Sequence, residues 1–283
     1  MSVTAQAGAL APTASAEPTT TSSDASMERN VTSRTWKVFW AWTAIFWGGT
    51  AVMGALFFVG VLDFPTSTKI SLYGTSVWLN GWMIPLLMPG AKSRDKFALM
   101  HECLVLWMVS YTMTNALWEI PWVLSSPFIF ENLNTLDDVV ARTAWMRESV
   151  VNMYWWVMAS FSSVDLRTVN HDSTFYTLEI WAFVNVASTF WFFKLNKKRS
   201  PLRYLVPVLG GGEPIAATFI FSFSEVFAGF RNMPGGVADT LLALVWTQYQ
   251  YIVFPAIFGV VGYKLLKADW NHIHGVKEES AAS

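Results

Sequence analysis

The sequence predicts an all-α membrane protein in which several helices cross the bilayer as a bundle. The chain of 283 residues is 53% hydrophobic and only 14% charged, whereas soluble domains average about 25% charged residues. Several long windows are almost free of charge, and about 18 such residues are enough to predict a transmembrane helix. Basic residues gather in alternate connections between these windows. Together these observations predict a polytopic helix bundle.

Six windows contain either no charged residue or a single acid. They are residues 38–62, 70–91, 103–130, 173–193, 204–224 and 240–263. The second window is the weakest prediction, because Asn80, Pro85 and Pro89 interrupt it, and a re-entrant segment is the alternative. The single cysteine, Cys103, excludes an intramolecular disulfide and a cysteine-based metal cluster.

The basic residues predict the orientation of these spans. If six spans alternate from a cytoplasmic N-terminus, 14 of the 19 Lys and Arg residues lie on the cytoplasmic side and five on the other. This bias agrees with the positive-inside rule and predicts that both termini are cytoplasmic. The chain then divides into a disordered cytosolic tail (1–37), two N-terminal spans (38–96), a membrane domain (97–267) and a polar C-terminal tail (268–283).

The longest polar connection is residues 131–170. Its apolar residues, which include Val139, Trp145 and Trp155, follow a rough helical stripe, while Arg147 and Glu148 would be costly inside a membrane. The pattern predicts an amphipathic helix on the membrane surface rather than a further span.

Three acids lie inside predicted spans, namely Glu119, Glu179 and Glu213. An ionised carboxylate in mid-bilayer is costly, so such residues normally face a cavity or a partner. Asn115 precedes the first acid by four residues, and Asn185 follows the second by six. The alternative interpretation is a hydrogen-bonded acid that only holds helices together.

Other acids lie closer to the ends of the spans. We expect Glu225 to reach the membrane rim and the pair His101 and Glu102 to lie at the cytoplasmic interface. Neither position is predicted to belong to the site.

Aromatic residues flank the first two intramembrane acids. Trp118 and Trp122 surround Glu119, and Trp181 follows Glu179 closely. Aromatic residues usually pack a core or face lipid, but beside a carboxyl their faces also stabilise a cation. A carboxyl group held in apolar surroundings keeps its proton and can donate it to a base as weak as an alkene.

The stretch DLRTVNHDSTFYTLE (165–179) carries the pattern D-x-R-x4-D-x6-E at the entrance to a span. With SPLRYLV (200–206) and the proline inside QYQYIVFPAIFGVVGYKLL (248–266), it resembles the emopamil-binding protein family, which shares the EXPERA domain. The family includes sterol Δ8–Δ7 isomerase and the sigma-2 receptor. The resemblance covers residues 97–267 and implies a core of five helices around a lipid-facing cavity, to which 70–91 adds one span.

The resemblance also implies the roles of individual residues. Glu119 and Glu179 match two family glutamates, whereas Asn115 stands where the isomerases have a histidine that helps to deliver the proton. Gln248 and Tyr251 replace an Asn and a Trp that precede the mid-span proline. We therefore expect Glu119, Glu179 and Asn115 at the catalytic position. The expected ligand-binding residues are Trp118, Trp122, Asp172, Trp181, Asn185, Glu213, Gln248 and Tyr251.

The sequence thus favours a membrane-embedded isomerase that moves a C=C bond of a sterol or terpenoid by protonation and deprotonation. The short pattern N-x-x-W-E (115–119) also resembles integral-membrane terpene cyclases, and a non-catalytic binder of sterols or amines is a further alternative. A scaffold, and a proton-coupled transporter, fit less well. We expect no metal, no organic cofactor and no nucleic acid as partners. We expect the chain to contact membrane lipid and, in a eukaryote, to lie in the endoplasmic reticulum. The sequence does not determine the oligomeric state, and a homodimer is one alternative.

Overall fold

The computed structural model describes residues 29–130, 133–149 and 152–276, and all regular structure in these ranges is helical. The predicted all-α class is therefore confirmed for this part of the chain. The longer elements are α2 (Ser33–Phe58), α3 (Phe64–Trp78), α5 (Lys96–Thr114), α6 (Ile120–Ile129), α10 (Trp181–Lys197), α12 (Gly212–Phe227) and α14 (Tyr249–Ile273). The shorter ones are α4 (Ile84–Leu87), α7 (Leu136–Thr143), α8 (Met153–Ala159), α9 (Ser173–Glu179), α11 (Leu205–Gly210) and α13 (Gly236–Leu241).

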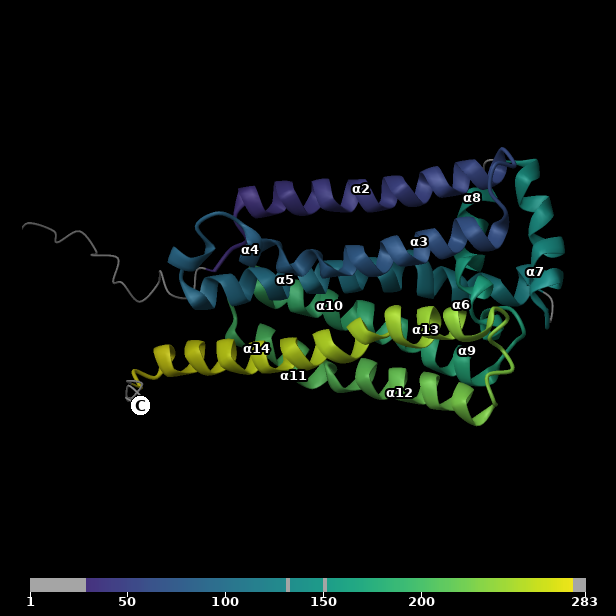
Figure 1. Cartoon of the computed structure of the whole chain (residues 1–283). Coiled ribbons are helices and arrows are strands. Elements are labelled where there is room, and N and C mark those ends of the chain that lie inside the picture. Colours follow the sequence, from purple (N-terminus) through teal and green to yellow (C-terminus); the bar gives the residue numbers. More distant parts are fainter. Residues whose placement is uncertain (1–28, 131–132, 150–151, 277–283) are drawn as a thin grey trace, which may run out of the picture.

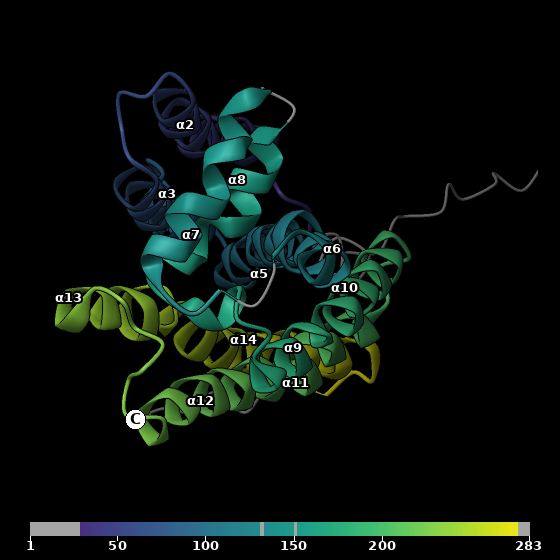
Figure 2. The same ribbon diagram turned by 90° about the vertical axis from the view of Figure 1, so that its right-hand side faces the viewer.

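The long helices lie side by side along one direction and form an elongated bundle (Figure 1). Helices α2 and α3 pack together at one side, and α11, α12 and α14 form the opposite side (Figures 1 and 2). Helix α5 runs between them, and its Leu104 and Leu106 are fully buried. The described start of α2 and the end of α14 lie at the same end of the bundle, while α7 crosses the other end (Figure 1).

Three helical stretches are long and apolar enough to cross a membrane. They are Ser33–Phe58, Pro201–Phe227 and Gly236–Ile273. They contain or overlap the predicted spans 38–62, 204–224 and 240–263. A membrane protein built on transmembrane helices is the class that these stretches indicate.

Three helices of the first half, α2, α3 and α5, begin at side-chain caps. Thr32 accepts a hydrogen bond from the amide of Thr35 at the start of α2. Asp63 and Asp95 accept bonds of 2.7 Å from backbone amides in the first turns of α3 and α5. A cap pairs one of the backbone N–H groups that the first turn leaves without a partner. These short polar residues therefore set where each apolar helix begins.

The ends of the described chain are more ordered than the sequence predicted. Residues 1–28 and 277–283 of the two predicted tails lie outside the described residues, but α2 already starts at Ser33 and α14 runs to Ile273. Arg29 pairs with the fully buried Asp269, which also pairs with Arg203 at 3.3 Å. The prediction of a disordered tail was wrong at 33–37, where α2 begins, and α14 extends through 268–273 of the predicted polar tail.

The connection 131–170 is not one amphipathic surface helix. It contains α7, a 3₁₀ turn (Ala144–Glu148), α8 and two further 3₁₀ turns (Ser160–Ser163 and Leu166–Thr168). Trp156 of α8 is fully buried and stacks on Phe57 of α2 with ring centroids 6.4 Å apart. The surface prediction was wrong for α8, because residues 153–163 carry no charge and enter the bundle.

Two acids expected at membrane interfaces are also fully buried. Glu102 pairs with Arg94 at 2.7 Å and accepts a hydrogen bond of 3.1 Å from the Thr35 hydroxyl. Glu225 lies 3.4 Å from Arg167 and accepts a hydrogen bond of 2.9 Å from the Asn232 amide. Neither side chain extends into the interface, because each has a basic partner inside the protein.

Candidate functional site

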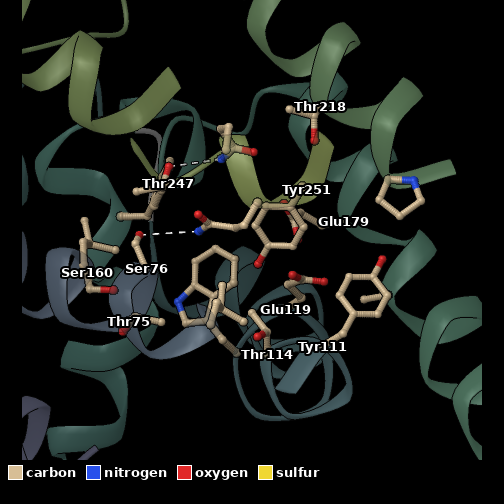
Figure 3. A pocket seen from close by; sticks show the side chains of 18 of the residues that line it. Thr75, Ser76, Tyr111, Thr114, Glu119, Ser160, Glu179, Thr218, Thr247 and Tyr251 are labelled. Carbon is tan, nitrogen blue, oxygen red and sulfur yellow. Dashed lines mark hydrogen bonds between the residues drawn. The ribbon is translucent and has the colours of Figure 1, made fainter. Parts of the chain in front are cut away.

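A cavity of about 180 Å³ lies inside the bundle, between α2 and α3 on one side and α12 and α14 on the other. Side chains from both halves of the chain line it, and Figure 3 shows it from close by. The polar lining residues include Thr50, Ser71, Thr75, Ser76, Thr114, Glu119, Ser160, Glu179, Asn185, Glu213, Thr218, Thr247, Gln248 and Gln250. Trp47, Leu72, Tyr111, Trp118, Trp156, Phe161, Phe175, Phe221 and Tyr251 are among the aromatic and apolar ones.

Three carboxyl groups from three different elements face this cavity. Glu119 closes a π-helical turn after α5, Glu179 ends α9, and Glu213 lies in the first turn of α12. Their charges interact with one another when ionised. Asn185 lies beside Glu213 in the same wall. Three acids that are distant in sequence therefore share one small volume.

The described surroundings of these acids contain no compensating charge. None of the described residues that line the cavity is Lys, Arg or His. The side chains of Glu119 and Glu179 form neither an ion pair nor a hydrogen bond with the described part of the chain, and Glu213 Oε2 is buried without a partner there. The cavity is thus complementary to a positive charge.

A π-helical turn, Asn115–Glu119, carries Trp118 and Glu119 into the cavity wall. Pro121 follows it and has no N–H to offer to the carbonyl of Leu117, to which the Tyr154 hydroxyl instead donates a hydrogen bond of 2.8 Å. The Trp118 indole donates to the carbonyl of Val157 at 3.1 Å. Such turns are frequent at functional sites, where they reorient side chains.

A second π-helical turn, Leu242–Trp246, joins α13 to α14. It is followed at once by Thr247 and Gln248, and then by Gln250 and Tyr251, which all line the cavity. Both π-helical turns in the described chain therefore lie next to the cavity. Each one adds a residue to the helical turn and so changes which side chains of the following helix face inward.

The cavity has two chemically different sides. Figure 3 shows Thr75, Ser76, Ser160 and Thr247 on one side and Glu119, Glu179 and Tyr111 on the other, with Tyr251 between them. On the hydroxyl side, Gln250 Nε2 donates to Ser76 Oγ over 3.5 Å. The carboxyl side carries acids and aromatic faces, and the hydroxyl side offers neutral donors and acceptors.

Aromatic rings form much of the wall beside the acids. The rings of Tyr111 and Tyr251 are 6.3 Å apart, as are those of Trp118 and Phe161. Phe221 joins the wall through Phe161, with ring centroids again 6.3 Å apart. Ring faces of this kind stabilise a nearby cation by their quadrupole.

The structure brings together most of the residues that the sequence assigned to the site. Those that line the cavity are Trp118, Glu119, Glu179, Asn185, Glu213, Gln248 and Tyr251.

Four other assigned residues lie elsewhere. Asn115 is buried and donates to the carbonyl of Tyr111 at 2.8 Å, so it is placed in the helix packing rather than in the cavity wall. The Trp122 indole donates to the carbonyl of Thr168, Asp172 caps α9 by accepting a bond from the Phe175 amide, and Trp181 lines a neighbouring cavity.

Two groups stand out among the lining residues that sequence reasoning missed. The first group comes from α8 and the turn after it (Trp156, Val157, Ser160 and Phe161), and the second from α3 (Ser71, Leu72, Thr75 and Ser76). The signal for the first group was the charge-free run 153–163, which the flanking Arg147 and Glu148 concealed.

The remaining buried acids differ from the three in the cavity. Glu102, Asp165, Glu225, Asp239 and Asp269 are all buried, and each forms an ion pair with Lys or Arg. Comparisons of the chain with family models, with curated proteins and with solved structures found no match.

Proposed function

We propose that this chain is a membrane-embedded enzyme that moves a C=C bond in a hydrophobic lipid, such as a sterol or terpenoid, by protonation and deprotonation. One observation carries the proposal. The buried acids outside the cavity all have basic partners, whereas Glu119, Glu179 and Glu213 share an aromatic cavity with no basic residue. This arrangement supplies proton donors and acceptors together with stabilisation for a cation.

The reaction balances with two carboxyl groups. One of Glu119 and Glu179, in its protonated form, gives H⁺ to one alkene carbon, and the π electrons form the new C–H bond. The neighbouring carbon becomes a carbocation, which faces the ring of Tyr251 or Trp118. The other acid, as a carboxylate, removes H⁺ from the other neighbour of the cationic carbon. The electrons of the broken C–H bond form the new C=C bond. The second acid then loses its proton to water, and the first acid takes up a proton from water, which restores the starting state and places solvent hydrogen on the next product.

The proposal includes a family and a topology. We propose an EXPERA-like core of five helices with one additional span at 70–91, six spans in all, and both termini in the cytoplasm, with the endoplasmic reticulum as the membrane in a eukaryote. Residues 64–87, which form α3, a 3₁₀ turn and α4 beside α2, support the additional span (Figure 1). The start of α2 and the end of α14 at one end of the bundle support a common side for the termini.

A second candidate function rests on the same uncompensated charge. A protein that binds sterols or cationic amines without chemistry would use one of the three acids as counter-ion to a ligand ammonium. An integral-membrane terpene cyclase is the remaining alternative, since protonation of an alkene or epoxide by the same acids also starts a cyclisation.

The test is turnover of membrane lipids in D₂O. Membranes with the chain should yield an isomer of the starting lipid with a shifted double bond. This product should differ in composition only by one hydrogen replaced by deuterium, in a new C–D bond. Glu119→Gln and Glu179→Gln should each reduce turnover at least about 100-fold, the lower range for loss of an acid–base group. Full turnover in both variants would refute the proposal.

Glu225→Gln is the matched control, because Glu225 is buried and ion-paired but does not line the cavity. Glu225→Gln should lower thermal stability and leave turnover per folded molecule unchanged. Glu119→Gln should instead reduce turnover without lowering thermal stability. Amine binding that both cavity variants abolish, with no deuterated product, would favour the binding protein. A deuterated product with an additional ring would favour the cyclase.

A further inference from the structure

A second cavity of about 440 Å³ lies next to the first, between α5, α10, α11 and α14. Its wall is mainly apolar and includes Trp107, Met108, Val184, Leu205, Val206 and Phe258. Glu213 is the one charged residue among those that line it. A space with this lining favours hydrocarbon over any polar group.

The two cavities share part of their walls. Tyr111, Asn185, Glu213 and Pro214 line both of them. The side chains of Asn185 and Glu213 therefore lie at the boundary, with Glu119 and Glu179 on one side and the apolar space on the other. A molecule that extends from one cavity into the other must pass this pair.

The far side of the second cavity faces outward. Trp181, Trp191, Leu202 and Leu209 line it, and between 46% and 76% of each of these side chains is exposed. They belong to α10 and to the stretch Pro201–Phe227, which is apolar enough to cross a membrane. Lipid chains would therefore reach this side of the bundle directly.

We propose that the second cavity holds the hydrocarbon chain of the ligand while its reacting carbons lie among Glu119, Glu179 and Glu213. The inference rests on the proposed function and adds a substrate class, namely lipids with a long flexible chain that enter sideways from the bilayer. The occupant is a chain rather than a polar group because Glu213 alone is charged and stands at the inner boundary. The ligand then threads past the Asn185–Glu213 pair with its reacting end first.

A run of three glycines at the end of α11 allows a sharp test. No atom lies within 4 Å of the position that a Cβ would take at Gly210 or at Gly212, so both accept a side chain without backbone strain. Gly210 lines the second cavity and Gly212 lines neither cavity. Gly211 is unsuitable, since its Cβ would meet the carbonyl of Pro207 at 2.9 Å. Gly210→Phe and Gly212→Phe are thus a matched pair.

The probes are primary n-alkylamines of 4 to about 16 carbons, titrated against the full chain in detergent. Their ammonium group suits the acids, and each buried methylene should tighten binding about fourfold until the second cavity is full. Gly210→Phe should weaken binding of the longest amines at least tenfold and leave butylamine unchanged. Gly212→Phe should change neither. Gly210→Leu introduces a smaller side chain and should weaken binding of the longest amines by an intermediate amount. It replaces Gly210→Phe in the test if that variant folds poorly.

Affinity for long amines that Gly210→Phe leaves unchanged would overturn the inference and would identify the space as one filled by bilayer lipid. Affinity that stops rising after butylamine would also overturn it. Neither result affects the proposed function, which is decided by turnover of the Glu119 and Glu179 variants in D₂O. Absence of deuterated product with the wild-type protein would overturn the proposed function, whatever the affinities for the amines.

Discussion

Arg167→Leu tests how the cavity wall is held in place. Arg167 is 2% exposed and contacts several partners at once: Nη2 donates to Asp165 at 2.6 Å, and Nη1 donates to the carbonyl of Phe221 at 2.7 Å. Its guanidinium also lies 4.1 Å from the centre of the Phe221 ring, which lines the cavity, and 3.4 Å from Glu225. One side chain thus connects the turn before α9 to α12.

The expected effect is large because two acids would lose the one basic partner that each has in the described part of the chain. Removing one partner of a buried ion pair costs about 3–5 kcal/mol, since the other charge stays buried. For a chain of this size that corresponds to a fall in Tm of about 10 °C, at about 2–4 °C per kcal/mol. In Arg167→Leu with Asp165→Asn and Glu225→Gln, no charge is left unpaired, so more than half of the loss should return.

The single cysteine provides the assay. Cys103 is 4% exposed, so we expect it to react with a fluorogenic maleimide only when α5 separates from the bundle. Heating the detergent-solubilised protein with this reagent gives the Tm of each variant. Arg34→Leu, the same change at an exposed arginine, should shift the Tm by no more than about 1–2 °C. An Arg167→Leu protein that melts with the wild type, or a triple variant less stable than the single one, would refute this reasoning.

Two smaller predictions concern other contacts. Tyr154→Phe removes the hydroxyl that donates to the Leu117 carbonyl, and it should cost about 1 kcal/mol of unfolding free energy, measured by the same thiol assay; an unchanged Tm would show that water or another group replaces the bond. Gly235→Ala places a Cβ 1.5 Å from the present position of Asp239 Oδ2, so it should displace that carboxylate from Lys69 and cost about 1 kcal/mol or less. A Lys69→Met background should remove the cost, and an equal loss in both backgrounds would contradict the explanation.

The helical class could be predicted from charge alone, but the ends of the helices could not. Windows without charge located helical segments correctly, for example 38–62 against Ser33–Phe58. The window method reports apolarity, whereas the start of α2 is set by the cap at Thr32 and that of α3 by the cap at Asp63. Hydropathy alone assigns the polar residues at such caps to loops, and so the predicted boundaries are displaced by several residues.

The acids of the site could be recognised from sequence, but their state of pairing could not. An acid inside an apolar window stands out in any reading of the chain. Its partners do not, because Asp239 finds Lys69 across 170 positions and Asp269 finds Arg29 across 240. Only the folded chain shows which carboxyl groups have found a base.

That distinction bears on whether the cavity acids merely hold helices together. An acid in that role needs a donor or a base, as Asp165 has in Arg167 at 2.6 Å. Glu119 and Glu179 have neither in the described chain, and when ionised they repel each other and Glu213. Ionising them in the empty protein is therefore unfavourable. A positive charge brought by a ligand, or formed on it during reaction, would turn this repulsion into attraction, and a purely structural role supplies no such charge.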